Sequence, residues 1–94
     1  MPTVYLLHLK IPEGCNWVTR HYIGYTTRSV KARLKRHRAG DGARMLALAN
    51  NLGIRYNVVK TWNFETREEA YAFEQRFKQA GHYARHCKVC RQLR

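Results

Sequence analysis

The chain has few acidic residues: 6 Asp and Glu stand against 18 Lys and Arg in 94 residues, which gives a net charge of +12. So large a basic excess favours a polyanionic partner, and nucleic acid is the commonest one. An acidic membrane surface is the usual rival, but the chain lacks a long basic amphipathic helix with a bulky apolar face. A protein that is basic without binding any polyanion remains an alternative.

Long apolar runs, cysteines and prolines are also scarce. No run approaches the ~20 residues of a membrane span, and the N-terminal residues lack the apolar region of a secretory signal. The three cysteines, an odd number without a signal peptide, indicate a reducing, cytoplasmic location. Six Tyr, three Phe and two Trp within a 45% hydrophobic composition are typical of a globular chain, and the length fits one domain.

The hydrophobic pattern predicts three strands and three helices. In chain order they are a strand over 3–9, a strand over 18–26, a helix over 29–38, a helix over 43–52, a strand over 54–62 and a helix over 66–80. The first two strands should pair as an antiparallel hairpin, because a Pro and Gly turn separates them. The order predicts an α+β domain over 1–81 in which helices cover a small sheet, followed by a basic, weakly patterned tail over 82–94.

The helix over 29–38 places polar residues where an apolar face is expected. Its only large apolar residues are Val30 and Leu34, and at about 100° per residue Arg33 and His37 share their face. Inward charges are costly unless they are paired or bind a ligand. The pattern therefore indicates a site on this helix.

A similar exception occurs in the helix over 66–80. Its apolar stripe is Ala70, Phe73 and Phe77, and Glu74 falls beside that stripe. Other acidic residues stand at the start of this helix, where the helix dipole favours them, whereas Glu74 has no such local reason. An Arg, a His and a Glu turned inward from separate helices indicate one shared site.

Four sequence elements, in order, resemble the GIY-YIG nuclease family. The Tyr-Ile-Gly at 22–24 reproduces the second motif element, and Thr-Val-Tyr at 3–5 corresponds to the first, although Gly-Ile is missing. The segment 33–37 has the family's Arg followed four residues later by His, and Glu74 stands at the position of its late helical Glu. The resemblance covers roughly residues 3 to 80.

This resemblance implies a metal-dependent DNA endonuclease with a small three-stranded antiparallel sheet flanked by helices. Glu74 would bind one Mg²⁺ or Mn²⁺, leaving the other ligand positions to water and phosphate. Arg33 would bind the phosphate oxygens and stabilise the developing charge. Tyr5, Tyr22 and His37 are the candidates for taking the proton of the attacking water, and the choice among the three stays open.

Each of these residues also has an ordinary structural interpretation. The tyrosines could be strand aromatics, His37 a core histidine, and Glu74 the partner of Arg33 in an ion pair. The functional alternative is a non-catalytic basic module that binds nucleic acid on the same fold. If the chain is an enzyme, nicking or structure-specific cutting of duplex, branched or single-stranded DNA is favoured, and a protein partner could supply sequence specificity.

A basic face on and near the first helix is the predicted DNA-binding surface. Its residues are Arg28, Lys31, Lys35, Arg36, Arg38 and Arg44. Such contacts would position the phosphate backbone and not read the bases. The alternative is a solvated helix face.

The tail contains a possible zinc site. His82, His86, Cys87 and Cys90 offer two imidazoles and two thiols, the donors of tetrahedral zinc. Their spacing is more compact than that of a standard zinc finger, so a basic tail with two reduced thiols is the favoured interpretation.

Overall fold

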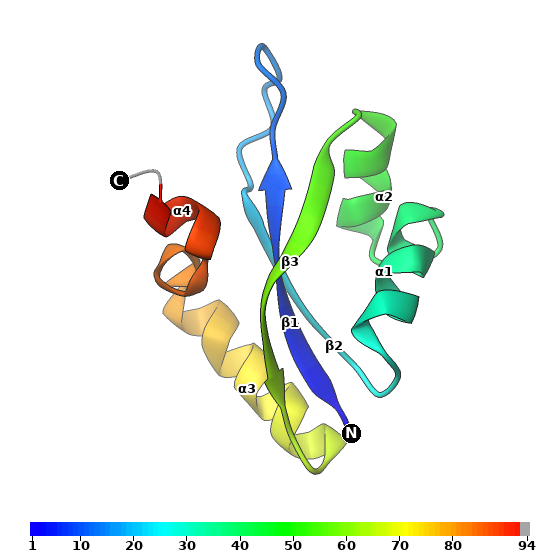
Figure 1. Ribbon diagram of the computed structural model, residues 1–94, viewed down its shortest axis with the longest axis vertical. Coiled ribbons are helices and arrows are strands. Elements are labelled where there is room, and N and C mark those ends of the chain that lie inside the picture. Colours follow the sequence, from blue (N-terminus) through cyan, green and yellow to red (C-terminus); the bar gives the residue numbers. More distant parts are fainter. Residues whose placement is uncertain (93–94) are drawn as a thin grey trace.

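The computed structural model describes residues 1–92 and shows a three-stranded antiparallel sheet between two layers of helices (Figure 1). The elements are β1 (Thr3–Lys10), β2 (His21–Thr26), α1 (Val30–Arg38), α2 (Arg44–Asn51), β3 (Arg55–Asn63), α3 (Arg67–Ala80), the 3₁₀ helix η1 (Tyr83–His86) and α4 (Lys88–Gln92). The strand order is β2-β1-β3, with both pairings antiparallel. The predicted α+β class and the β1–β2 hairpin are confirmed.

The central strand β1 is buried on both faces. Tyr5, Leu7 and Leu9 point toward α1 and α2, while Val4 and Leu6 point toward α3 and the C-terminal helices. A strand covered on both sides has apolar residues at nearly every position instead of a strict alternation. This is why the strand can carry catalytic candidates on one face and pack a second core on the other.

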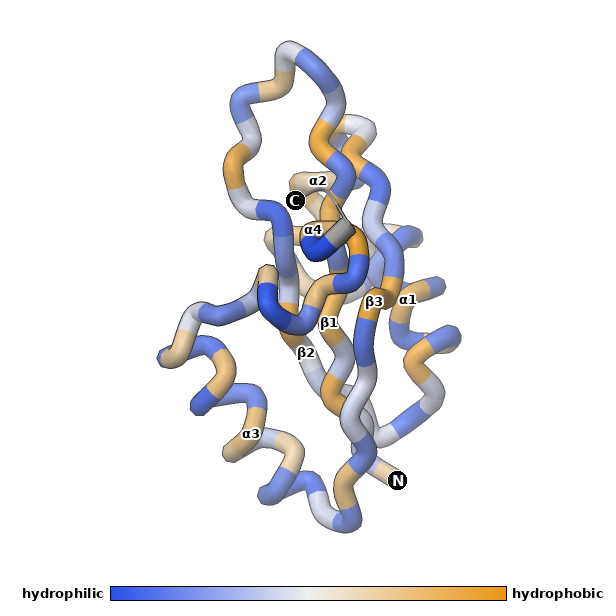
Figure 2. Tube along the Cα trace, turned by 60° about the vertical axis from the view of Figure 1, so that its left-hand side comes forward, coloured by the Kyte–Doolittle hydropathy of each residue, from blue (hydrophilic) through white to orange (hydrophobic). Residues whose placement is uncertain are grey.

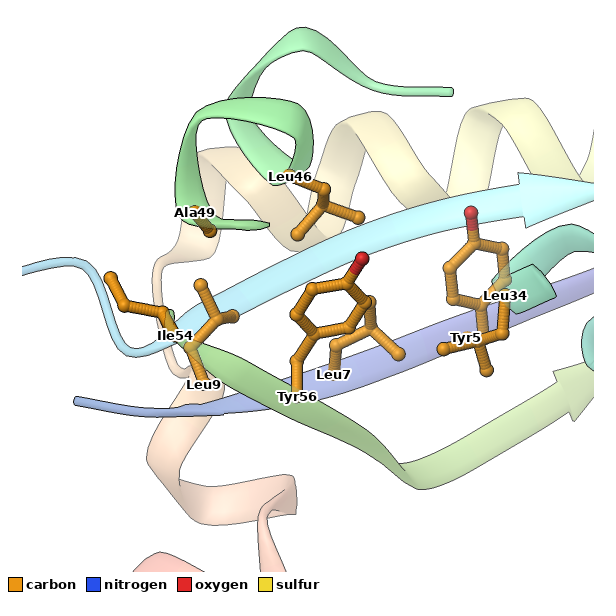
Figure 3. Close-up of a cluster of buried hydrophobic side chains, with 8 residues drawn as sticks. All are labelled: Tyr5, Leu7, Leu9, Leu34, Leu46, Ala49, Ile54 and Tyr56. Carbon is orange, nitrogen blue, oxygen red and sulfur yellow. The ribbon is translucent and has the colours of Figure 1, made fainter. Parts of the chain in front are cut away.

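The first core cluster lies between the sheet and the pair α1–α2 (Figure 3). Its buried members are Tyr5, Leu7, Leu9, Leu34, Leu46, Ala49, Ile54 and Tyr56. The hydroxyl oxygens of the two tyrosines point away from the strands that carry them (Figure 3). The core therefore places polar atoms at the boundary between sheet and helices.

Local signals define the helix ends as expected. The hydroxyl of Ser29 accepts a hydrogen bond from the Ala32 amide at 3.1 Å, and that of Thr66 accepts one from the Glu69 amide at 3.2 Å. Such N-caps satisfy amides that have no partner within the helix. Gly81 ends α3 with φ 69°, the left-handed conformation that glycine adopts readily.

The second strand is shorter than the predicted range of 18–26. Residues 11–20 form a loop that extends past the sheet, and the Trp17 indole donates to the Thr19 carbonyl at 2.8 Å within it. Val18 is 83% exposed, so its β-propensity has no core to pack against. The predicted strand was therefore wrong at residues 18–20, which belong to the loop.

The C-terminal segment is more ordered than a weakly patterned tail. It forms η1 and α4, which lie over the β1–β2 hairpin (Figure 2), and the side chain of Cys87 is completely buried there. Positions 93 and 94 of the predicted tail lie outside the described residues. Of the helices in residues 1–92, none has the length and apolar character needed to span a membrane.

Candidate active site

Two tyrosines and a histidine form an aromatic cluster where β1 and β2 meet α1. Tyr5 extends from β1 and Tyr22 from β2, and their ring centroids are 6.3 Å apart. The ring of His37, on the buried face of α1, lies 6.1 Å from Tyr5 and 5.8 Å from Tyr22. Arg33 stands one helical turn before His37, so the four residues that the sequence singled out on these elements come together.

The close approach of Tyr5 to β2 depends on a glycine. Gly24 is the register partner of Tyr5, and a Cβ at this position would lie 2.7 Å from the Tyr5 hydroxyl oxygen. Real Cβ atoms do not come so close to a fixed side chain, so only glycine leaves room for the phenol. The glycine of the Tyr-Ile-Gly motif at 22–24 therefore has a packing role in the site.

The hydrogen bonds of His37 define which of its nitrogens carries the proton. Nδ1 accepts from the Ala43 amide at 3.2 Å, and Nε2 lies 2.8 Å from the Tyr5 hydroxyl oxygen. Burial, helped by the positive charges of Arg33 and Arg36, lowers the pKa of His37 to about 4. The imidazole is therefore neutral at pH 7, with its proton on Nε2 donated to Tyr5.

Opposing effects act on the two phenols. Burial raises the pKa of Tyr5 to about 12, with a further increase from Tyr22, while a hydrogen bond and the charge of Arg33 oppose the rise. Burial and then the charge of Glu74 raise the pKa of Tyr22, against Arg33 and Lys78. Added positive charge at this site would favour the ionised phenols.

Arg33 has a buried donor that no protein group uses. Its Nε is the one buried side-chain nitrogen or oxygen without a hydrogen-bond partner among residues 1–92. An unsatisfied buried donor lowers the stability of the protein by about 1–3 kcal/mol. A ligand that accepts a hydrogen bond from this atom would remove that cost. A phosphate oxygen meets that requirement.

Glu74 is the only buried carboxylate of the chain, since the other five acidic residues, all within the described part, are exposed. Its Oε1 pairs with the Lys78 ammonium at 2.8 Å, one turn along α3. The alternative of an Arg33–Glu74 ion pair is therefore not what the structure shows. Sequence reasoning missed Lys78, although a Glu–Lys spacing of four on a helix was a usable signal.

A single buried carboxylate at an otherwise basic site fits a divalent cation such as Mg²⁺. This ion takes oxygen ligands and commonly keeps several waters, so one or two carboxylates and the substrate phosphate complete its shell. Glu74 lies close enough to Tyr5 and Tyr22 for its charge to act on both phenols. The donor set is thus consistent with one metal ion at Glu74.

Part of the predicted DNA-binding surface lines a pocket of about 580 Å³ that includes Arg33. Arg28, Lys35 and Arg36 lie in its wall, together with Arg67 at the start of α3. Arg67 was not among the predicted residues, because its helix is separated from α1 by more than 25 positions in the chain. The pocket joins the catalytic candidates to a continuous basic surface.

The remaining predicted basic residues lie at the margin of this surface. Lys31 and Arg38 line a neighbouring hollow with Lys35. Arg38 also donates to the Tyr56 carbonyl at 3.1 Å, so it links α1 to β3. Arg44 is exposed at the start of α2 and lines neither hollow.

The predicted grouping of the tail histidines with the two cysteines does not form. His82 is exposed, and the ring of His86 packs against Trp62 at 5.7 Å. Cys87 and Cys90 approach two histidines of the β1–β2 hairpin instead. The zinc alternative considered for the tail was wrong in its histidines, because the histidines that approach the cysteines lie 69 to 82 positions earlier in the chain.

Fold and site together define a small nuclease-like α+β domain, in which strand tyrosines face an Arg, a His and a Glu from flanking helices. The family model of the GIY-YIG catalytic domain matches residues 2–84. The chain belongs to the GIY-YIG family, and this places it in a superfamily of nucleases, which hydrolyse phosphodiester bonds. Searches found no matching curated protein and no matching solved structure.

Proposed function

We propose that the protein is a divalent-metal-dependent DNA endonuclease with catalytic residues Tyr5, Tyr22, Arg33, His37 and Glu74. The unpartnered Nε of Arg33 carries this proposal. A buried guanidinium donor that faces two phenols and a basic pocket suits a phosphate that arrives with the substrate. A purely structural arginine would have its donors satisfied by the protein.

Arg33 is proposed to bind and stabilise the phosphoryl group. Its planar guanidinium donates along fixed directions, so it holds phosphate oxygens in a defined orientation. The same donors lie where negative charge grows in the transition state, and this differential stabilisation is what accelerates the reaction.

Tyr22 is proposed to accept the proton of the attacking water. Tyr5 is 1% exposed and beyond the reach of water, whereas Tyr22 is only partly buried. The Tyr5 hydroxyl oxygen accepts a hydrogen bond from Nε2–H of His37. Its own O–H can donate a hydrogen bond to Tyr22, which stabilises the ionised Tyr22 phenol. His37 and Tyr5 then orient Tyr22, and neither of them is itself the base.

Glu74 would hold one Mg²⁺ or Mn²⁺. When bound, such an ion polarises the phosphoryl group, lowers the pKa of nearby water and stabilises the leaving oxygen. Lys78 competes for the same carboxylate, so Glu74 has to exchange this ion pair for the metal. Because the side chain of Lys78 is 47% exposed, its ammonium can return to water when the metal binds.

The substrate is proposed to be DNA, cut by nicking or at branched and single-stranded structures. The basic pocket offers guanidinium and ammonium groups, which contact backbone phosphates and carry no sequence information. A protein partner could add sequence specificity. The odd number of cysteines supports a reducing, cytoplasmic location.

The first experiment offers supercoiled plasmid, single-stranded and branched oligonucleotides with Mg²⁺, Mn²⁺ or EDTA. Wild-type protein should cut with metal and not with EDTA, and Glu74→Gln, which keeps the shape of the side chain, should lose the activity. Glu68→Gln is the matched control, because it changes an exposed acid on the same helix. DNA that is bound but never cut under any metal would contradict the enzyme proposal.

The Glu74–Lys78 ion pair favours a second candidate, a non-catalytic DNA-binding module. In this case the ammonium remains on the carboxylate and no metal is held. The module would bind DNA equally well with Mg²⁺ or EDTA, and Glu74→Gln would leave that binding unchanged.

A further inference from the structure

Four metal-ligand side chains meet on the face of the sheet opposite the cluster of Tyr5, Tyr22 and His37. His8 and His21 are direct register partners on β1 and β2. Cys87 and Cys90 approach them from the C-terminal segment, and one ligand atom from each of the four residues lies within 4.8 Å of all the others. They belong to three separate parts of the chain, so their convergence results from the tertiary fold.

Three sulfur–nitrogen distances within this group are close to those of a tetrahedral zinc centre. Bonds of about 2.3 Å to sulfur and about 2.0–2.1 Å to nitrogen place neighbouring sulfur and nitrogen ligands about 3.6 Å apart. In the structure, His8 Nδ1 lies 3.3 Å from Cys87 Sγ and 3.6 Å from Cys90 Sγ, and His21 Nε2 lies 3.3 Å from Cys90 Sγ. Because all four ligand atoms lie within 4.8 Å of one another, one ion at the centre could contact all of them after small side-chain adjustments.

Neighbouring groups already support this arrangement. The Cys90 amide points at the Cys87 sulfur at 3.5 Å, which suits a thiolate that needs a hydrogen-bond donor. The ring of Tyr83 stacks on His21 with an interplanar angle of 10°, and this holds the imidazole in place. Cys87 is fully buried among the apolar residues of the second core.

We propose that His8, His21, Cys87 and Cys90 bind one structural Zn²⁺. Two thiolates and two imidazoles are soft donors that select zinc and disfavour Mg²⁺. Four protein ligands leave no open position for substrate, so this ion serves the fold and does not take part in hydrolysis. The protein would then use two metals of different chemistry, one at Glu74 of α3 and one where the C-terminal segment meets the β1–β2 hairpin.

The structural role follows from where the ligands lie in the chain. Helix α4 has five residues, and η1 has four, so neither is stable alone. The ion would hold them against the hairpin, linking residues that lie 69 to 82 positions apart in the hydrogen-bonded pairs of the group. His21 also precedes Tyr22, so the zinc site anchors the start of the strand that carries the proposed base.

The decisive measurement is the metal content of the purified wild-type chain by inductively coupled plasma mass spectrometry. About one zinc per chain is expected. Cys90→Ser and His8→Asn should each reduce the zinc content at least about tenfold. Cys15→Ser, His82→Asn and His86→Asn are matched controls that should retain it.

Cobalt gives a readout that needs neither activity nor a folded variant. Wild-type protein reconstituted with Co²⁺ should show the intense visible bands of a tetrahedral ion and the near-ultraviolet charge-transfer band of cobalt thiolate bonds. A folded wild-type chain without zinc, or one whose intact mass shows a Cys87–Cys90 disulfide, would overturn the proposal. Loss of zinc in His82→Asn or His86→Asn would overturn the ligand assignment.

The zinc proposal and the nuclease proposal fail separately. Glu74→Gln should keep its zinc while losing DNA cleavage, because Glu74 and the four ligands lie on different elements. If the same variant loses zinc as well, the two sites are not independent and the structural assignment is wrong.

Discussion

At the scale of single residues, the direction of the hydrogen bonds at His37 decides which group can take up a proton. The Ala43 amide occupies Nδ1, and Nε2 donates to Tyr5, so neutral His37 has no free lone pair for the proton of a water. The pKa of about 4 keeps it in this form at neutral pH. The proton acceptor is therefore sought among the tyrosines, and the less buried Tyr22 is the one that water can reach.

Replacing each tyrosine by Phe separates the two roles. Tyr22→Phe should lower the single-turnover cleavage rate by about 100-fold or more, because it removes the proton acceptor. Tyr5→Phe should cost about tenfold and shift the rising limb of the pH–rate profile to higher pH, because Tyr22 loses a hydrogen-bond donor to its ionised form. The rate of the wild-type enzyme should rise from pH 7 toward pH 10, since burial raises both phenol pKa values. A larger loss in Tyr5→Phe than in Tyr22→Phe would contradict these roles.

His37 should make the protein less stable in acid. The pKa of its imidazole falls from 6.5 to about 4 on folding, so between these values the unfolded chain binds a proton that the folded chain does not. The free energy of unfolding should therefore decrease as the pH falls from about 6.5 to about 4, by up to about 3 kcal/mol from this residue. Urea denaturation at a series of pH values measures it, with His37→Gln as the comparison. If the variant loses as much stability in acid as the wild type, His37 is not the source.

Three charged or polar residues of the candidate site could be selected from sequence because each broke a local rule, whereas Tyr5 and Tyr22 were selected only from the resemblance to the family. Arg33, His37 and Glu74 stood at positions where a helix should be apolar, and Gly24 interrupted a strand. The hydrogen-bond partners could not be selected in this way. The Ala43 amide carries no side-chain signal, and the Glu74–Lys78 pair resembles the many exposed pairs that stabilise helices.

At the scale of secondary structure elements, the fit of β2 against β1 depends on Gly24. Gly24→Ala should destabilise the protein by about 1–3 kcal/mol, because the new methyl group would displace the Tyr5 ring from β2. The same displacement should lower cleavage by moving Tyr5 away from His37. Thermal denaturation with cleavage assays tests both effects, and Thr61→Ala at an exposed position opposite Tyr5 on β3 is the control. Unchanged stability in Gly24→Ala would show that the sheet has room at this point.

Element types were predictable wherever a local pattern or cap defined them. The predicted helix ranges 29–38 and 66–80 agree with the observed helices and their caps at Ser29, Thr66 and Gly81. The start of β2 was not predictable, because Val18 is a residue type that favours strands. Only its exposure in the structure shows that it lies outside the strand. The packing of α4 was also hidden, since its contacts with His8 and His21 depend on residues about 70 to 80 positions away.

At the scale of the whole molecule, part of the excess positive charge lies beside the proposed active site. The pocket beside Arg33 is lined by five Arg and Lys residues, and the net charge of +12 adds a general attraction for polyanions. Under the proposed function, this charge would attract DNA by long-range electrostatics and bring its backbone to Arg33.

Binding to DNA should therefore be strongly dependent on salt. The double variant Lys35→Ala and Arg67→Ala should flatten the dependence of log affinity on log salt concentration by about 1 to 2 units, since each lost phosphate contact removes about 0.9. Fluorescence anisotropy with a duplex oligonucleotide in EDTA measures this slope without cleavage. Lys10→Ala, at the end of β1 next to the hairpin loop, should leave the slope almost unchanged. If the salt-dependence slope is the same for the wild type, the double variant and Lys10→Ala, this pocket is not the DNA-binding surface.

The central claim is that Glu74 and the residues around it cut DNA with the help of one divalent metal. The most direct test measures binding and cleavage of the same branched oligonucleotide by wild-type protein and Glu74→Gln in Mg²⁺. We expect the wild type to bind and cut, and Glu74→Gln to bind with similar affinity while its cleavage rate falls by about 1,000-fold or more. Equal cleavage by the two proteins, or cleavage by neither with binding intact, would contradict the claim.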